Sequence, residues 1–149
     1  MLSESLYTPN FLSMNLERWD QRMSPFILIV DDNALNRDVL AVILREVGIS
    51  FAGLESPVNL KMTLDQMTHL DAVFLDLEMP GMNGYEALEV LKAHPVSHDI
   101  PVVAYTVHVS QVNQARSAGF HSFLAKPIDS TQFISHLNRI LSGESVWEI

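Results

Sequence analysis

Three carboxylates, one hydroxyl and one ammonium group each follow a short apolar run in this sequence. They belong to Asp31, Asp32, Asp76, Thr106 and Lys126. Carboxylates that lie close together repel one another, and a hard divalent cation relieves that repulsion. Because Mg²⁺ prefers carboxylate and carbonyl oxygens, a Mg²⁺ site is the first chemistry that these residue types favour.

Phosphoryl transfer to a carboxylate is a second chemistry that the same residues support. An aspartate can attack a phosphoryl group and form an aspartyl phosphate, while a cation stabilises charge on the transferring oxygens. Asp76 is the best candidate nucleophile, because it ends an apolar run and precedes a turn. Lys126 could bind a phosphoryl oxygen or pair with Asp76, and Thr106 could bind another oxygen. Taken singly, such residues also fit a helix cap, a strand-end hydroxyl and a surface lysine.

The elements that would position these side chains are short strands and amphipathic helices. Apolar runs bounded by polar or turn residues are typical of strands buried on both faces of a parallel sheet. Such runs lie at 26–30, 73–75, 102–105 and 123–125, with a weaker one at 49–54. Apolar residues recur at helical spacing at 35–47, 60–67, 85–91 and 133–141, and a fifth helix, mostly polar, is expected at 110–118. Five alternating strands and helices predict an α/β fold whose strands end at one shared edge, where ligands bind.

The overall composition favours a single intracellular domain. The chain has 149 residues, 48% of them hydrophobic, which suits one globular domain. Its 18 acidic and 9 basic residues give a net charge of −9, which argues against binding to nucleic acid or to an anionic membrane. Without cysteine there is no disulfide, thiol nucleophile or cysteine-bound metal. Neither a membrane span nor a signal peptide is present in the sequence, so we expect a cytoplasmic protein.

One segment carries a strong resemblance to a known family. Residues 74–86 (FLDLEMPGMNGYE) resemble the phosphoacceptor strand and following loop of the receiver domains of bacterial two-component response regulators. Segments 29–36, 101–106 and 123–128 carry the rest of the signature, and the resemblance covers about 25–143. It implies a flavodoxin-like (βα)5 fold, a doubly wound parallel sheet with strand order 2-1-3-4-5.

The resemblance implies roles for the acids and the lysine at the strand ends. Asp76 resembles the phosphorylated aspartate, Asp32 the direct Mg²⁺ ligand, and Asp31 an acid that acts mainly through water. The backbone carbonyl of Glu78 would complete the protein's ligands to Mg²⁺. Lys126 resembles the phosphate-binding lysine of such domains.

The resemblance also implies a switch and a control on phosphoryl lifetime. Thr106 resembles the switch hydroxyl, and Phe123 the aromatic residue that turns inward once the hydroxyl has moved. Tyr105 is either a packing residue or a lid over this switch. Glu78 and His108 stand at the positions that flank the site in the family and tune the lifetime of the phosphoryl group.

Three local backbone features are predicted as well. Gly84 fits a tight entry to the third helix, where a side chain would be costly. The Lys126–Pro127 bond resembles the cis peptide of the family. Asp129 with Gln132 fits a capping box at the start of the last helix.

The function implied is that of a phosphoacceptor signalling protein rather than an enzyme acting on other substrates. A histidine kinase or a histidine phosphotransfer protein would donate a phosphoryl group to Asp76 in a Mg²⁺-dependent reaction. The domain would support its own phosphorylation and autodephosphorylation. The face made of the fourth helix, fifth strand and fifth helix would then change shape and contact a downstream protein. A homodimer is one assembly that it could form.

The two ends of the chain are predicted to lie outside the receiver at 25–143. At 1–24 we expect an extension with an amphipathic helix, because apolar residues recur there at helical spacing, and Thr8 and Pro9 fit its start. The apolar residues at this spacing are Leu12, Leu16, Trp19 and Met23. The helix would pack on the receiver or mediate association, and a disordered leader preceding a start at Met23 is the third alternative. A tail at 144–149 is too short for an output module, so we expect a stand-alone receiver.

Two other classes of function stay open from the sequence. A pseudo-receiver would act as a constitutive scaffold without phosphate turnover, although the full set of acids with Thr106 and Lys126 argues against it. An aspartate-based phosphatase would need a second acid two residues after its nucleophile, where Glu78 stands, but the Met-Pro-Gly that follows favours the receiver. The sequence has no glycine-rich phosphate loop to support a flavodoxin-like cofactor protein.

Overall fold

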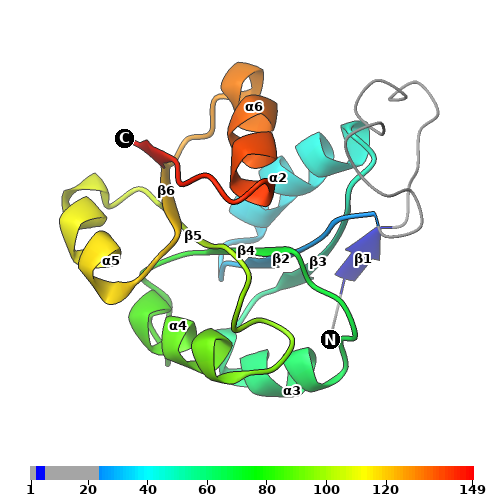
Figure 1. The fold of residues 1–149 in the computed structure, drawn as a ribbon, viewed down its shortest axis with the longest axis vertical. Helices are drawn as coiled ribbons and strands as arrows, with labels where there is room; N and C mark the ends of the chain where they lie inside the picture. Colours follow the sequence, from blue (N-terminus) through cyan, green and yellow to red (C-terminus); the bar gives the residue numbers. More distant parts are fainter. Residues whose placement is uncertain (1–2, 6–23) are drawn as a thin grey trace.

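A sheet with helices on both faces organises the protein (Figure 1). The computed structural model describes residues 3–5 and 24–149 of the chain. The strands are β1 (Ser3–Ser5), β2 (Phe26–Val30), β3 (Ser50–Leu54), β4 (Ala72–Leu75), β5 (Val102–Thr106), β6 (Ser122–Ala125) and β7 (Trp147–Glu148). The α-helices are α2 (Ala34–Glu46), α3 (Leu60–Asp65), α4 (Gly84–Ala93), α5 (Val112–Ala118) and α6 (Ser130–Leu141), and 3-10 turns η3 (Pro57–Asn59) and η4 (Val109–Gln111) precede α3 and α5.

The predicted five-strand core is confirmed. β2 to β6 pair in parallel in the order β3-β2-β4-β5-β6, which is 2-1-3-4-5 when these five strands are counted alone. The five predicted helices also appear, with ends shifted by a few residues. The most polar candidate, at 110–118, is a 3-10 turn followed by a short helix, of which only Ala115 is buried.

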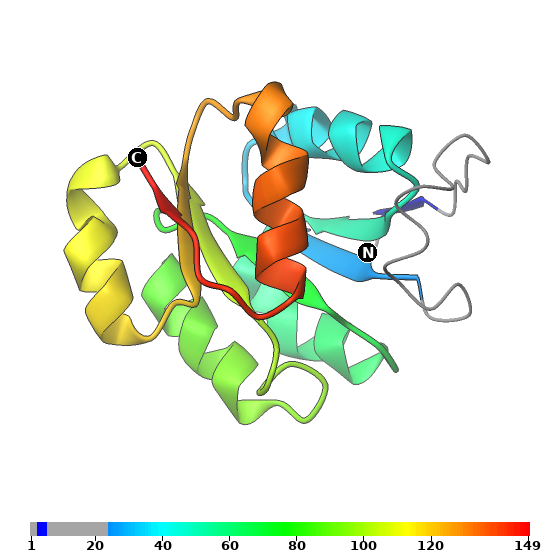
Figure 2. The same cartoon turned by 45° about the horizontal axis from the view of Figure 1, so that its top comes forward.

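Two apolar cores lie on opposite faces of the sheet. Along β2, Leu28 and Val30 point to one face while Ile27 and Ile29 point to the other, as the two-residue period of a strand requires. Helices α3, α4 and α5 cover the first face, and α2 and α6 cover the second (Figures 1 and 2). Because both faces are covered, every residue of the central strand β4 is buried. The backbone that leads to Asp76 is therefore fixed by packing on both sides.

Side-chain caps fix the starts of α4 and α6, as Asn33 does for α2. Asn83 and Glu86 form a reciprocal capping box at the start of α4, beside the sheet edge that carries Asp76. At α6, Asp129 is the cap, as predicted. Its carboxylate accepts hydrogen bonds from the main-chain N–H and the hydroxyl of Thr131, each at less than 3.0 Å. These bonds take the place of the capping box that we expected.

Two strands were not predicted. β1 pairs antiparallel with β3 at one edge of the sheet, and β7 pairs in parallel with β6 at the other. β7 belongs to segment 144–149, which we expected only as a short tail. The amphipathic helix predicted for segment 1–24 falls on residues outside the described part of the chain. Among residues 3–5 and 24–149, no helix has both the length and the apolar character that crossing a bilayer requires.

Candidate functional site

Main-chain hydrogen bonds place the predicted site residues side by side at the carboxyl edge of the sheet. The Asp76 N–H donates to the Val30 carbonyl of the neighbouring strand at 3.0 Å, and Asp31 follows Val30 directly. Thr106 ends β5, and its carbonyl accepts from the Lys126 N–H at 2.9 Å. The sheet ladder thus continues one residue past the strands, so the side chains leave the same edge.

The three predicted acids come together. One carboxylate oxygen from each of Asp31, Asp32 and Asp76 lies within 4.8 Å of the others. Asp31 is 1% exposed and Asp76 is 8% exposed, whereas Asp32 faces solvent. A set of hard carboxylate oxygens that is open to water on one side fits a Mg²⁺ ion, which keeps several of its waters when it binds. The residues present therefore suit the metal that the sequence predicts.

The Lys126 ammonium lies inside this acid cluster. Its Nζ is 2.6 Å from Oδ2 of Asp31 and 3.4 Å from Oδ2 of Asp76, and the lysine side chain is 5% exposed. Nζ also lies 4.9 Å from the centre of the Tyr105 ring. The sequence suggested Asp76 as its partner, but Asp31 is nearer. One buried ammonium between two buried carboxylates leaves the cluster with excess negative charge.

The surroundings of Asp76 disfavour its ionised form. Burial raises the pKa of the Asp76 carboxyl above its ordinary value; the charge of Lys126 opposes the rise and the charge of Asp31 adds to it. The Asp76 Oδ1 accepts from the Leu77 N–H at 2.8 Å. Burial and the same two carboxylates raise the pKa of Tyr105 to about 12. Burial is the largest cause of both shifts, and a bound cation would favour the ionised form of Asp76.

The three residues assigned to a switch are all buried. The Thr106 hydroxyl accepts from the His108 N–H at 3.1 Å. Tyr105 packs edge-on against Phe74 with ring centres 6.2 Å apart. Phe123 is fully buried in the core on the α5 side of the sheet. A rotation of Phe123 would therefore start from an inward position, whereas the resemblance implies an aromatic residue that turns inward.

A hydrogen-bonded rim connects the loops that follow β4 and β5. His108 Nε2 lies 3.0 Å from Glu78 Oε2, and both side chains are partly exposed. The Gln111 amide donates to the same Glu78 oxygen at 3.3 Å, and the Tyr85 hydroxyl donates to the Gln111 carbonyl oxygen at 2.8 Å. Two of these residues, Glu78 and His108, were singled out in the sequence. Gln111 and Tyr85 were missed, because no motif connects a tyrosine in α4 to a glutamine in η4, 26 residues further on.

The start of α4 is pressed against the site. The Gly84 N–H donates to the Leu77 carbonyl at 2.8 Å. A Cβ on Gly84 would lie 2.5 Å from the Asp76 carbonyl oxygen and 2.7 Å from the Leu77 Cα, so a side chain does not fit there. The prediction of a tight helix entry is confirmed. The Lys126–Pro127 peptide bond is cis, also as predicted.

Comparison with known proteins agrees with this geometry. The family model "Response regulator receiver domain" matches residues 27–138. A curated relative, probable histidine kinase 6 of Oryza sativa subsp. japonica, is 30% identical over 138 residues, which are 78% of this chain and 14% of that protein. The chain therefore spans about one seventh of that relative.

Two solved structures are similar to this chain over nearly their whole length. A response regulator receiver protein from Burkholderia phymatum is 30% identical with a TM-score of 0.70, over 80% of this chain and 96% of that one. The receiver domain of a sensor histidine kinase from Pseudomonas aeruginosa PAO1 is 25% identical with a TM-score of 0.72, over 80% and 98%. That second structure has a magnesium ion coordinated in its active site cleft.

Proposed function

The chain belongs to the family of response regulator receiver domains, and from this premise we propose that Asp76 is the phosphoacceptor of a phosphorelay. The observation that carries the proposal is the convergence of Asp31, Asp32 and Asp76 around the Lys126 ammonium. Transfer to a carboxylate needs a nucleophile, ligands for a cation and positive charge near the phosphoryl oxygens. This cluster brings those groups to one edge of the sheet.

The proposed donor is the phosphohistidine of a histidine kinase or of a histidine phosphotransfer protein. A carboxylate oxygen of Asp76 attacks the phosphorus, the new O–P bond forms, and the P–N bond breaks. The imidazole nitrogen leaves with the bonding electron pair and takes up a proton. Lys126 and Thr106 would each bind a phosphoryl oxygen. The Lys126 ammonium would then have to share its contact with Asp31 with the phosphoryl oxygen.

Apolar side chains near the site support docking of a protein donor. Leu35 and Val107 are 71% and 60% exposed, and they stand in the segments that follow β2 and β5 at the carboxyl edge of the sheet. Val58, in η3 after β3, is exposed at the same edge. Large apolar side chains around a charged centre suit contact with another protein better than contact with a small solute alone. The histidine kinase among the relatives supports the same class of donor.

Mg²⁺ is the cofactor that we propose for this transfer. The carboxylates of Asp31, Asp32 and Asp76 would hold it, with the main-chain carbonyl of Glu78 as a further ligand. When bound, the ion would neutralise charge on the transferring oxygens. The magnesium ion in the cleft of the Pseudomonas receiver domain supports this assignment.

The proposed output is a change of the face made of α5, β6 and α6. A phosphoryl group adds about −1.5 to −2 charges near neutral pH. That charge would draw Thr106 toward Asp76 and away from its hydrogen bond with the His108 N–H. Phe123, in the adjacent strand β6, would then move and alter this face, which would bind a downstream protein. Loss of the phosphoryl group by autodephosphorylation would reverse the change, with Glu78 and His108 setting its rate.

The proposal is tested by incubating the protein with Mg²⁺ and acetyl phosphate, or with beryllofluoride, beside the Asp76→Asn variant. We expect wild type to gain one phosphoryl group in intact-mass spectra and to show amide shifts at Thr106 in NMR spectra, and Asp76→Asn to do neither. Asp99→Asn is the matched control, since Asp99 is highly exposed and lies just before β5, away from the site. A wild-type protein without mass gain or shift, beside a receiver that responds to the same reagents, would leave the pseudo-receiver scaffold as the better description.

Three predictions about the cellular setting rest on the same proposal. We propose a cytoplasmic location, because a kinase makes phosphohistidine from ATP inside the cell. An immunoblot of native cells with an antibody against the receiver tests whether it acts as a stand-alone protein. Sedimentation before and after beryllofluoride addition tests the homodimer.

A further inference from the structure

A strand of the chain's own tail covers the face that we propose as the output surface. β7 pairs in parallel with β6, and it lies between α5 and α6 (Figure 2). The pairing joins Phe123 to Trp147 and Leu124 to Glu148. A partner that binds this edge of the sheet therefore meets a site that is already occupied.

Several specific contacts hold the tail in place. Val146 is 1% exposed, its N–H donates to the Ser122 hydroxyl at 3.0 Å, and its carbonyl accepts from the Phe123 N–H at 2.8 Å. The Trp147 ring lies under the Arg116 guanidinium of α5 at 4.3 Å. The tail is thus fixed by a buried apolar residue, by main-chain pairing and by an aromatic ring on a cation.

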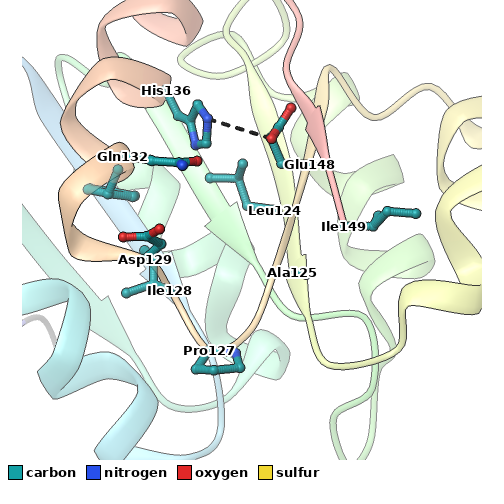
Figure 3. Close-up of a pocket in the computed structure, with 10 residues that line it drawn as sticks. Leu124, Ala125, Pro127, Ile128, Asp129, Gln132, His136, Glu148 and Ile149 are labelled. Carbon is teal, nitrogen blue, oxygen red and sulfur yellow. Dashed lines mark ion pairs between the residues drawn. The ribbon is translucent and has the colours of Figure 1, made fainter.

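The charges of the two sides are complementary. The tail has acidic residues at Glu144 and Glu148. Arg139 of α6 binds Glu144, and His136 of α6 lies 4.0 Å from Glu148 (Figure 3). Few basic side chains exist in a chain of net charge −9, and two of them, Arg116 and Arg139, contact this segment.

The groove is longer than the strand that fills it. β6 runs over four residues, Ser122–Ala125, but β7 has two. Beside the paired Leu124 and Glu148 a cavity of about 170 Å³ lies between β6 and α6, with Ala125, Gln132 and Ile149 also in its wall (Figure 3). That volume has room for a further side chain of an extended peptide. Ala125 is the one residue of β6 that lies past these pairings and past the contact of Ser122 with Val146.

We propose that the edge of β6 between α5 and α6 is a docking groove for an extended segment of a partner protein, with an apolar, an aromatic and an acidic residue in succession. Residues 146–148 (Val-Trp-Glu) are the intramolecular occupant of this groove. The partner segment would add a strand to the sheet, place its aromatic ring on Arg116 and its acid beside His136. The inference deepens the proposed function, because it names the ligand class of the output face and makes the tail its competitor.

Competition follows from the connection within one chain. A tethered segment acts at an effective concentration that reaches millimolar values for short linkers, so a free peptide binds weakly until the tail is loosened. The Phe123 N–H is bound by the tail, and Phe123 is the proposed switch residue. A movement of Phe123 would therefore act directly on the strand that occupies the groove.

The test uses the full chain with Trp147→Ala, which weakens the occupant and leaves the groove unchanged. The probe is a fluorescent peptide of residues 143–149 (GESVWEI), followed by anisotropy. We expect it to bind the variant at least about tenfold more tightly than wild type. A peptide with alanine in place of tryptophan should bind the variant weakly, and adding Arg116→Ala should remove the gain. If Trp147→Ala fails to fold, Val146→Ala provides a milder release.

A reversible crosslink supplies the second arm. The chain has no cysteine, and the Val146 N–H, just before β7, is hydrogen-bonded to the Ser122 side chain, so Ser122→Cys with Val146→Cys is the pair chosen for a disulfide between the tail and β6. In the Trp147→Ala background the oxidised protein should not bind the peptide, and the reduced protein should bind it. Peptide binding that is equal in the oxidised and reduced proteins would overturn the proposal of a docking groove. So would a covalent dimer as the main oxidation product, because a second copy would then exchange tails.

The beryllofluoride response of the same samples separates the two proposals. A normal response at Thr106 with no gain in peptide binding for Trp147→Ala overturns the docking groove and leaves the phosphoacceptor role intact. Peptide binding that follows the expected pattern in a protein without a beryllofluoride response supports the groove and contradicts the phosphoacceptor role.

Discussion

Lys126 Nζ lies 2.6 Å from Oδ2 of Asp31, although β6 and β2, the strands that they directly follow, are separated by β4 and β5 in the sheet. Both side chains are nearly inaccessible, with 5% and 1% exposed. The pair therefore spans the carboxyl edge of the sheet and passes beside Asp76. Without a second cation, this lysine is the charge that allows two carboxylates to be buried together.

Replacement of Lys126 by methionine should destabilise the metal-free protein. Removing one partner of a buried ion pair leaves an uncompensated charge, which typically lowers the free energy of unfolding by about 3–5 kcal/mol. Chemical denaturation in the presence of a chelator measures the loss. Added Mg²⁺ should recover part of it, because a bound cation replaces positive charge beside Asp31 and Asp76.

A lysine at the surface provides the matched control for that substitution. Lys61 pairs with Asp65 at 3.3 Å, and both side chains are largely exposed. Exposed pairs contribute little to stability. Lys61→Met should therefore leave the denaturation midpoint unchanged with and without Mg²⁺. A similar loss in both variants would mean that the Lys126 effect is not one of buried charge.

Asp76→Asn should make the metal-free protein more stable at neutral pH. Burial raises the pKa of Asp76 above its ordinary 3.8, so the folded protein holds this proton more tightly than the unfolded chain does. The free energy of unfolding therefore falls as pH rises from 3.8 through the raised pKa, and the ionised carboxylate lowers stability above that window. Denaturation with a chelator at several pH values should show the advantage of Asp76→Asn at pH 7 shrinking as pH falls toward 3.8. An advantage that is constant with pH would contradict ionisation as its cause.

The fold and the acid cluster could be predicted because they depend on local patterns. Apolar runs mark the buried strands, and each of the residues that follow them, such as Asp31 and Asp76, must lie at the carboxyl edge once the strands are parallel. Gly84 was predictable for the same kind of reason. It stands directly after a tight loop, where there is no space for a side chain. These inferences require only the order of the elements.

Contacts that depend on side-chain reach could not be predicted in the same way. Lys126 follows its strand as expected, but whether it turns to Asp31 or Asp76 depends on a few ångströms of packing. β7 was not predicted because a strand of two residues has no periodic pattern. Its pairing depends on one buried side chain, Val146, and on the Ser122 hydroxyl. The hydrogen bond from Tyr85 to Gln111 likewise joins elements that sequence spacing does not relate.

Gly84→Ala should disturb both stability and the site. The added Cβ would lie 2.5 Å from the Asp76 carbonyl oxygen, so the α4 start or the Asp76 loop must shift. Overpacking of this kind lowers the free energy of unfolding by about 1–3 kcal/mol, and a displaced Asp76 should also weaken Mg²⁺ binding in a calorimetric titration. Gly53→Ala is the control, because a Cβ there meets only the Arg37 side chain at 3.5 Å. Equal effects of the two substitutions would exclude the close contact as the cause.

His108→Ala should shorten the life of the phosphoryl group on Asp76. In wild type, His108 and Glu78 meet at 3.0 Å and connect the loops that follow β4 and β5, and we expect this contact to restrict the approach of water to the site. An exposed pair of this kind contributes about 0.2–1 kcal/mol, so its loss should speed dephosphorylation by no more than about fivefold. Phosphate release after removal of the donor measures the rate. His98→Ala is the control, since His98 pairs with Asp99 before β5, at the opposite edge of the sheet. Slower release from His108→Ala would show instead that the imidazole assists the attacking water. His108 would then act as a general base and would not hinder the approach of water.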